Sequence, residues 1–257
     1  MEIQRYKDEF FCKKRIVLVG VLVLIILCFF MTVKYGKNNG NGENNSIMIQ
    51  NRNIIKVACV GDSITYGYGL VNWEKNNYPV ILASLLGKSY QVKNFGDNGS
   101  CVQADAEQPY EMTAAYEESI SFESDILIFM LGTNDSKVEN WKGIEVFKEQ
   151  YLKLLDSYLK GEHMPDVYLC TPAHSFSLTG SSGGVVNFEV QPEMVDQMAE
   201  CVRQIAKERE YPLIDIHVLT ENHPEWFKED GIHPDENGAE AIAKEVWRVL
   251  NEKAESE

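Results

Sequence analysis

Five short apolar runs alternate with longer helical segments over most of the chain. The runs are almost continuously apolar, which is typical of strands buried on both faces of a sheet. They span residues 54–60, 90–95, 125–131, 166–170 and 211–216. The segments between and after them space apolar residues at intervals of three and four, as amphipathic helices do. These segments span residues 78–86, 141–160, 192–209 and 237–250. The alternation predicts one α/β domain, a five-stranded parallel sheet with helices on both faces.

The charge divides the chain into two parts. Its 257 residues carry 24 Lys and Arg against 39 Asp and Glu, a formal net charge of −15. Residues 1–37 hold seven basic and three acidic side chains, a net charge of +4, so the remainder carries −19. A body this acidic repels phosphates, which disfavours nucleic acid as a partner. Because 44% of the residues are hydrophobic, the chain can bury a core and is not expected to be disordered.

An uncharged apolar stretch at residues 16–33 lies within the basic part. As a helix it would reach about 27 Å, close to the thickness of a bilayer's hydrocarbon core. The basic cluster before it is denser than the one after it, so the positive-inside rule places residues 1–15 in the cytoplasm. We therefore expect a transmembrane anchor at 16–33, a flexible Asn/Gly-rich linker at 34–52 and an extracytoplasmic domain at 53–257.

A cleaved signal peptide is the alternative for this stretch. Its apolar region usually has about 7–15 residues and is followed by a small-x-small cleavage site. The run here is longer, and residues 32–35 offer no such site. Cys28 would suit a lipoprotein, but Ile26 and Leu27 before it are not the small residues that such processing requires. The sequence therefore favours an uncleaved anchor.

Ligands bind at the carboxyl ends of strands in parallel sheets, so the residues that follow the apolar runs matter most. The first run is followed by GDSIT, in which Ser63 could present its hydroxyl as a nucleophile or could cap a helix. The third run is followed by GTND, in which Asn134 could donate to an oxyanion or could serve a turn.

Two further loops carry candidate residues. The second run leads into NFGDNGS, residues 94–100, whose glycines allow close approach of the backbone and supply N–H donors. Near the C-terminus, DGIHP places Asp230 three residues before His233. The aspartate could fix the histidine tautomer so that the other ring nitrogen accepts a serine proton. Either segment alone could equally be an ordinary surface loop.

Taken together and in this order, the four blocks resemble the SGNH (GDSL-type) hydrolase family over residues 54–250. The resemblance implies a flavodoxin-like three-layer α/β/α sandwich with esterase activity and no metal or cofactor. It implies that Ser63 is the nucleophile, His233 the general base and Asp230 the residue that orients the histidine.

The same resemblance implies an oxyanion hole. Its donors would be the N–H of Ser63, the N–H of Gly99 and the side chain of Asn134. Gly96 competes for the place of the glycine, because both glycines precede a polar turn. Gly99 is preferred because it follows Asn94 by five residues, as the family pattern usually has it.

Other polar residues have competing interpretations. Five potential metal ligands lie within thirteen residues: His223, Glu225, Asp230, His233 and Asp235. Their spacing matches no helical HExxH pair, and prolines interrupt the segment, so we expect no metal site there. Asp215 is an alternative partner for His233, although its position after a strand favours a buried or capping carboxylate.

Trp73 and His174 are candidate substrate contacts. His174 follows the fourth run and precedes a Ser/Gly-rich stretch, and Trp73 could offer an aromatic platform to a sugar or an acyl chain. Four cysteines of the body lie mostly on expected strands or helices with no CxxC pair, which favours buried thiols over disulfides. They are Cys59, Cys101, Cys170 and Cys201.

An anchored, outward-facing hydrolase is expected to act on acyl esters of extracellular glycans, with O-acetyl removal favoured. A lysophospholipase or thioesterase is the alternative within the family, and a non-catalytic surface-binding domain is a third possibility. Asn98 and Asn134 both begin Asn-x-Ser triplets. Glycosylation of Asn134 would destroy the oxyanion hole, which favours a bacterial plasma membrane as the location.

Overall fold

The computed structural model describes residues 54–177 and 188–256. The expected tail, anchor and linker, residues 1–52, lie outside the described residues. Within the described ranges, no helix is both long and apolar enough to cross a bilayer. The described residues all belong to one compact unit of the chain.

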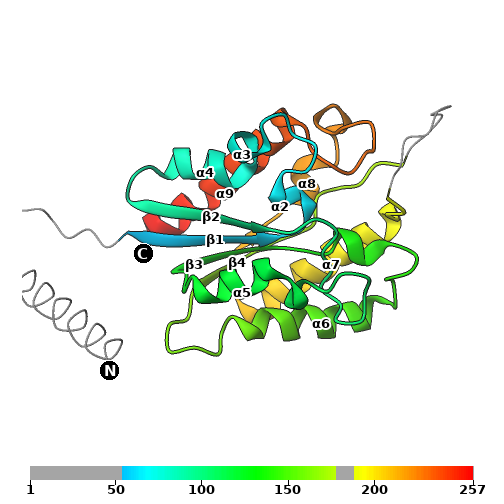
Figure 1. Cartoon of the computed structure of the whole chain (residues 1–257), viewed down its shortest axis with the longest axis horizontal. Coiled ribbons are helices and arrows are strands. Elements are labelled where there is room, and N and C mark those ends of the chain that lie inside the picture. The colour runs from blue at the N-terminus through cyan, green and yellow to red at the C-terminus, as the bar shows by residue number, and fades with distance from the viewer. Residues whose placement is uncertain (1–53, 178–187, 257) are drawn as a thin grey trace, which may run out of the picture. The chain divides into compact units, whose positions relative to one another are not determined.

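The centre of this unit is a five-stranded sheet in which all strands are parallel. The strands are β1 (Ile55–Gly61), β2 (Tyr90–Gly96), β3 (Ile126–Met130), β4 (Asp166–Cys170) and β5 (Leu213–Ile214). Their order across the sheet is β2-β1-β3-β4-β5 (Figure 1). The chain leaves β1 for β2 on one side and then returns to β3 on the other, so a topological switch point lies between β1 and β3. Doubly wound sheets of this order bind ligands at that point.

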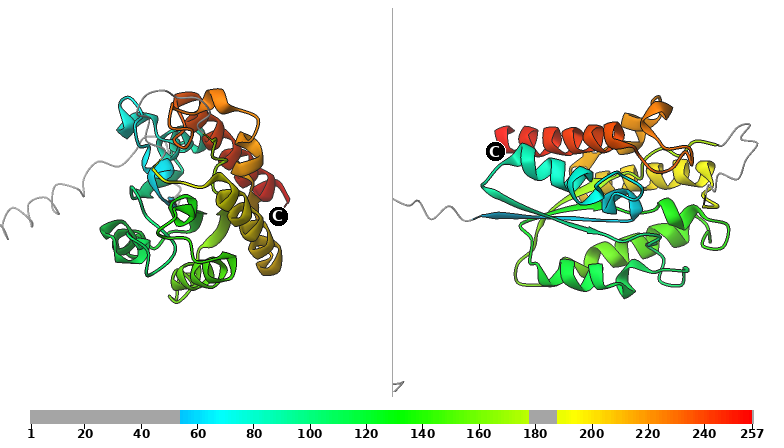
Figure 2. Two further views of the ribbon diagram at one scale, coloured as in Figure 1. Left: turned by 90° about the vertical axis from the view of Figure 1, so that its right-hand side faces the viewer. Right: turned by 45° about the horizontal axis from the view of Figure 1, so that its top comes forward.

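Long helices cover both faces of the sheet (Figures 1 and 2). On one face lie α4 (Tyr78–Leu86) and α9 (Glu236–Ser256), and on the other lie α5 (Ala114–Ser121), α6 (Ile144–Ser157) and α7 (Pro192–Arg209). Short helices occupy the connections: α2 (Ser63–Tyr66), α3 (Trp73–Asn76), α8 (Ile216–Thr220), η1 (Tyr110–Met112), η2 (Thr133–Ser136) and η3 (Pro224–Trp226).

The sheet separates two hydrophobic cores. Val57 and Cys59 of β1 point toward the α4 and α9 side, whereas Ala58 and Val60 point toward α5, α6 and α7. All four are fully buried, as expected for a strand covered on both faces. The predicted parallel α/β sandwich is therefore confirmed for the described residues.

The element boundaries differ from prediction where capping decides them. The expected helix at 141–160 is shorter, because Gly143 at φ +100° precedes the first helical residue, Ile144. The fifth strand has only two residues, because Asp215 caps α8 instead of extending β5. Helix α5 was not predicted, since its sequence AAYEESIS has no clear apolar period; in the structure Ser119 is its one buried residue. The four cysteines of the body are free and buried, as predicted.

Candidate active site

The turn after β1 presents Ser63 at the switch point of the sheet. Asp62, not Ser63, is the N-cap of α2, and its carboxylate accepts the N–H of Ile64 at 2.9 Å. A Cβ on Gly61 would lie 2.0 Å from the hydroxyl oxygen of Thr65, so this sharp turn requires glycine. The capping alternative for Ser63 is therefore not what the structure shows, and its hydroxyl is available for another partner.

That partner is His233, which is 170 positions away in the sequence. The Oγ atom of Ser63 lies 2.9 Å from Nε2 of His233. On the other side of the imidazole, Nδ1 lies 2.8 Å from Oδ2 of Asp230. The backbone N–H groups of Ile232 and His233 both donate to Oδ1 of Asp230 at 2.9 Å. The aspartate thus holds the ring and the turn that carries it.

The charge state of Asp230 sets the direction of these hydrogen bonds. Burial alone would raise the pKa of Asp230, but the hydrogen bonds from the ring and backbone of His233 and from the backbone of Ile232 outweigh it, and the pKa is lowered. An ionised carboxylate accepts the proton on Nδ1, which leaves Nε2 unprotonated and facing Ser63. The arrangement can therefore remove the serine proton during a nucleophilic attack.

Asn134 lies on η2, directly after β3, and is buried. Its Nδ2 donates to the carbonyl of Ser100 at 3.1 Å, and its own carbonyl accepts from Nδ2 of Asn140 at 3.0 Å. The second N–H of its amide has no acceptor within residues 54–177 and 188–256. Asn134 is thus fixed from two sides and keeps one donor free.

The two candidate glycines have different surroundings. The N–H of Gly96 donates to Oδ1 of Asn94 at 2.8 Å, and a Cβ on Gly96 would lie 2.1 Å from the backbone nitrogen of Tyr66. Gly96 is therefore a packing residue whose donor is already used. Gly99 adopts φ +83°, and its N–H has no acceptor among the residues that the structure describes. Of the two glycines, Gly99 has the free donor.

Asp135 was missed by the sequence analysis. It is fully buried, and its two oxygens accept the N–H groups of Val102 and Gln103, each at 3.0 Å. Burial raises its pKa to about 7, although these hydrogen bonds oppose the shift. Asp135 thereby ties the loop that carries Gly99 to the helix that carries Asn134. The sequence offered one indication of this role, the position of Asp135 within GTND. Its partners lie more than thirty residues away in the chain, so the sequence alone did not reveal the contact.

Two aromatic rings were also missed. The ring of Tyr68 lies 4.6 Å from the imidazole of His233, and that of Phe188 lies 5.3 Å from it. Tyr68 also lines a small cavity beside Ser63, with a volume of about 10 Å³. A space of that size holds about one water molecule. No sequence pattern distinguishes these two aromatic residues from core residues.

The other predicted residues have different contacts. Trp73 stacks on Tyr66 with ring centroids 4.3 Å apart, and its role as a substrate contact stays a prediction. The same holds for His174, whose Nδ1 lies 3.3 Å from Nε2 of His217. Asp215 does not contact His233. It pairs with Arg203 at 2.8 Å and caps α8, as the capping interpretation predicted.

The potential metal ligands near the C-terminus also separate. His223 pairs with Glu225 at 2.8 Å and stacks on Trp226, whereas Asp230 and His233 pair with each other. Asp235 instead accepts backbone N–H groups at the start of α9.

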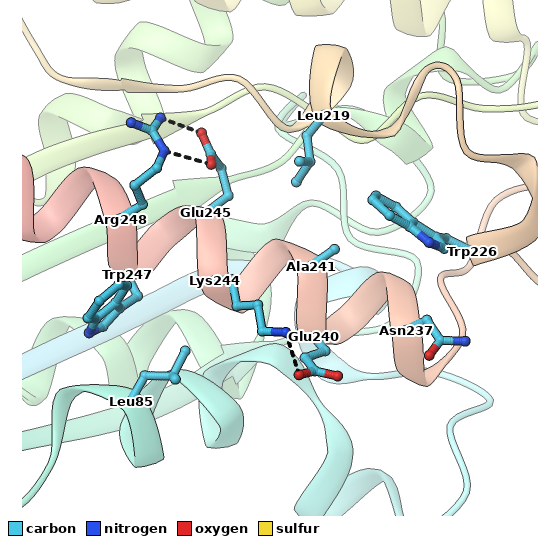
Figure 3. Close-up of a pocket in the computed structure, with 10 residues that line it drawn as sticks. All are labelled: Leu85, Leu219, Trp226, Asn237, Glu240, Ala241, Lys244, Glu245, Trp247 and Arg248. Atoms are coloured by element: carbon cyan, nitrogen blue, oxygen red, sulfur yellow. Dashed lines mark hydrogen bonds and ion pairs between the residues drawn. The ribbon is translucent and has the colours of Figure 1, made fainter.

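A larger groove of about 680 Å³ runs along α9 (Figure 3). Its lining includes Leu85 from α4, Trp226 from η3 and Trp247 from α9. None of its lining residues belongs to the constellation around Ser63. The groove is therefore not the place where the chemistry described above would occur.

The site is a hydrogen-bonded triad of a serine, a histidine and an aspartate at the switch point of a parallel sheet. Such a triad is the arrangement of a serine hydrolase. Residues 59–241 match the GDSL-like lipase/acylhydrolase family. The chain belongs to this family, and thus to the carboxylic ester hydrolases, as the resemblance of its motifs predicted.

Known proteins resemble the chain in sequence and in fold. An acetylxylan esterase from Xylanibacter ruminicola is 33% identical over 222 residues, which cover 80% of this chain and 45% of that protein. The chain thus spans less than half the length of this relative. A carbohydrate acetylesterase family member from Sinorhizobium meliloti matches with a TM-score of 0.62 at 19% identity, over 77% of this chain and 98% of that one. The aryl esterase of M. smegmatis matches with a TM-score of 0.61 at 19% identity, over 77% and 99% of the two chains. At this identity the two structures support the fold alone.

Proposed function

We propose that the protein is a serine esterase that removes acetyl or other short acyl groups from carbohydrate. The observation that carries this proposal is the triad of Ser63, His233 and Asp230. Ser63 lies 2.9 Å from His233, and His233 lies 2.8 Å from Asp230. In an ester hydrolase such a triad supplies a nucleophile, a general base and the residue that orients the base.

In the first half of the reaction, Oγ of Ser63 attacks the ester carbonyl carbon while Nε2 of His233 takes the serine proton. The resulting oxyanion accepts hydrogen bonds from the backbone N–H groups of Ser63 and Gly99 and from Nδ2 of Asn134. Each such donor typically lowers the barrier by about 3–4 kcal/mol. The protonated histidine then gives its proton to the leaving alcohol, which departs and leaves an acyl-serine.

In the second half, a water molecule gives a proton to Nε2 of His233 and attacks the acyl carbonyl. The tetrahedral intermediate collapses, His233 returns its proton to Oγ of Ser63, and the carboxylic acid leaves. The residues named here hold or move every proton of the cycle, so the proposal requires no cofactor.

One comparison supports an acetyl group on a carbohydrate alcohol. The relative that matches at 33% identity is an acetylxylan esterase, which supports a polysaccharide as the alcohol component.

We also propose that the domain acts outside the plasma membrane, held by a helix at residues 16–33. The length and charge of that segment support this placement. An alkaline phosphatase fusion at the C-terminus is expected to be active in bacterial cells, because this reporter folds only outside the cytoplasm. An inactive but stable fusion would contradict the proposed orientation.

The activity is tested with the full chain and a panel of p-nitrophenyl esters from acetyl to palmitoyl. We expect kcat/KM to be highest for acetyl and to fall with chain length, and we expect acetate release from acetylated xylan. Ser63→Ala should abolish both activities, whereas Ser84→Ala, a change at an exposed serine of α4, should keep them. A maximum at long chains would overturn the short-acyl assignment, and full activity of Ser63→Ala would overturn the proposed nucleophile.

A further inference from the structure

Three potential metal ligands converge from three separate elements, away from Ser63. His174 follows β4, Asp196 lies on α7 and His217 lies on α8. Nε2 of His217 lies 2.9 Å from Oδ1 of Asp196 and 3.3 Å from Nδ1 of His174. The third edge, from Nδ1 of His174 to Oδ1 of Asp196, is 3.7 Å. No sequence pattern joins these positions, so this cluster escaped the sequence analysis.

Hydrogen bonds alone leave one of the three contacts unsatisfied. If Nε2 of His217 carries a proton, it can donate to Asp196 and, more weakly, to an unprotonated Nδ1 of His174, but these two acceptors then face each other at 3.7 Å with no proton between them. If His174 donates to His217 instead, an unprotonated Nε2 faces a carboxylate oxygen at 2.9 Å, and two acceptors repel each other. A single cation at the centre would be attractive to all three atoms.

The distances also suit a particular kind of cation. A tetrahedral ion with bonds of about 2.0–2.1 Å to its ligands separates those ligands by about 3.3–3.4 Å. Of the three observed edges, 3.3 Å matches that value, 2.9 Å is shorter and 3.7 Å is longer. Two imidazole nitrogens and one carboxylate oxygen form a donor set that zinc prefers, with one position left open.

The backbone at both histidines is held in place before any ion binds. The backbone N–H of His217 donates to Oγ1 of Thr171 at 2.8 Å, and the backbone N–H of His174 donates to Oγ1 of Thr220 at 3.0 Å. Both threonines are fully buried. The side chain of His217 is only 10% exposed, whereas that of Asp196 is 52% exposed. The site is therefore buried on its inner side and open to solvent at the carboxylate.

We propose that His174, Asp196 and His217 bind a zinc-type divalent ion, which clamps the loop after β4 to α7 and α8. This loop contacts the turn of Asp230 and His233, because the N–H of Phe176 donates to the carbonyl of Gly231 at 2.8 Å. Bound metal would thus stabilise the segment that supports the histidine turn, without touching Ser63. This inference does not rest on the proposed esterase activity.

The test is equilibrium dialysis of the full chain against Zn²⁺, followed by measurement of the metal per chain. We expect one tightly held zinc and a higher Tm in its presence. Asp196→Asn and His174→Gln should each weaken binding by about tenfold or more and remove the rise in Tm. Glu193→Gln, which removes the same charge from an exposed position on the same helix, is the matched control and should bind normally.

Two results would overturn the proposal. One is a wild-type chain that retains no stoichiometric zinc, and the other is unchanged affinity in both Asp196→Asn and His174→Gln. Because Asp196 is on the surface, Asp196→Asn is expected to fold, so its zinc affinity can be measured whether or not His174→Gln folds. Ser63→Ala should bind zinc normally, so failure of the esterase assay and failure of the metal assay can be told apart.

Discussion

Replacing Asp230 by asparagine should separate its role in the reaction from its role in the fold. In the wild type, Oδ1 accepts two backbone N–H groups and Oδ2 accepts the proton on Nδ1 of His233. An asparagine can keep its oxygen on the two backbone donors, but its NH₂ group then faces Nδ1. Two donors 2.8 Å apart repel each other, so the imidazole proton is expected to move to Nε2. The nitrogen that faces Ser63 then cannot accept a proton.

The expected loss in kcat for Asp230→Asn is about 10⁴-fold, the size seen when a catalytic histidine takes the wrong tautomer. That factor corresponds to about 5 kcal/mol of barrier. The fold should lose only about 1 kcal/mol, because one charge-assisted hydrogen bond is exchanged and the backbone bonds remain. The assay is kcat and KM for p-nitrophenyl acetate, with Tm measured on the same samples.

Asp215→Asn is the matched control, since Asp215 was the alternative partner of His233 and instead pairs with Arg203. It should lower Tm and leave kcat close to the wild-type value. If Asp230→Asn keeps more than about a tenth of the wild-type kcat, the tautomer argument fails. An equal loss of kcat in Asp215→Asn would show that general destabilisation of the fold, and not the proton on Nδ1, causes the loss.

Four further substitutions test residues on the oxyanion side of the site. Asn134→Ala should lower kcat by about 10²–10³-fold with little change in KM, and a KM effect alone would contradict its role as a donor. Gly96→Ala should not fold, since a methyl group would lie 2.1 Å from a backbone nitrogen. Gly99→Ala should fold, but the strain of an alanine at φ +83° should lower the free energy of unfolding by about 1 kcal/mol. Thermal melts of both variants test this difference. The pKa of Asp135 is raised from 3.8 to about 7 in the folded chain, so folding takes up a proton between these values and stability falls as pH rises. Urea unfolding should show the wild type losing about 3 kcal/mol relative to Asp135→Asn between about pH 5 and about pH 8, and parallel pH curves would refute this.

The sequence predicted the sheet because burial on both faces leaves a strong pattern in the chain itself. β4 and the helices α4 and α7 begin and end where the apolar spacing indicated. Other element ends differ from the prediction because single side chains cap a helix there. The end of β5 is one case, where Asp215 caps α8, and the spacing of apolar residues does not reveal such a cap. Helix α5 escaped because it lies in a segment with little apolar periodicity.

Some residues of the candidate site could likewise be predicted from the sequence, and others could not. Ser63, Asp230 and His233 stand in short blocks with their own chemical pattern, and the structure brings them within hydrogen-bond distance. Asp135 and Tyr68 take their roles from contacts made only in the folded chain, Asp135 with a loop more than thirty residues earlier and Tyr68 with His233. Such residues cannot be recognised from their neighbours in the sequence.

The histidine and aspartate of the site share one tight turn, whereas the serine lies 170 positions earlier. The base is therefore assembled locally, and tertiary structure has only to deliver the nucleophile to it. Most of the sheet lies between these two places in the chain. Ester cleavage by a refolding sample should consequently lag behind the recovery of helical circular dichroism. A chain divided within that interval should hydrolyse esters only after its two fragments reassociate, which would make the domain a reporter of fragment assembly.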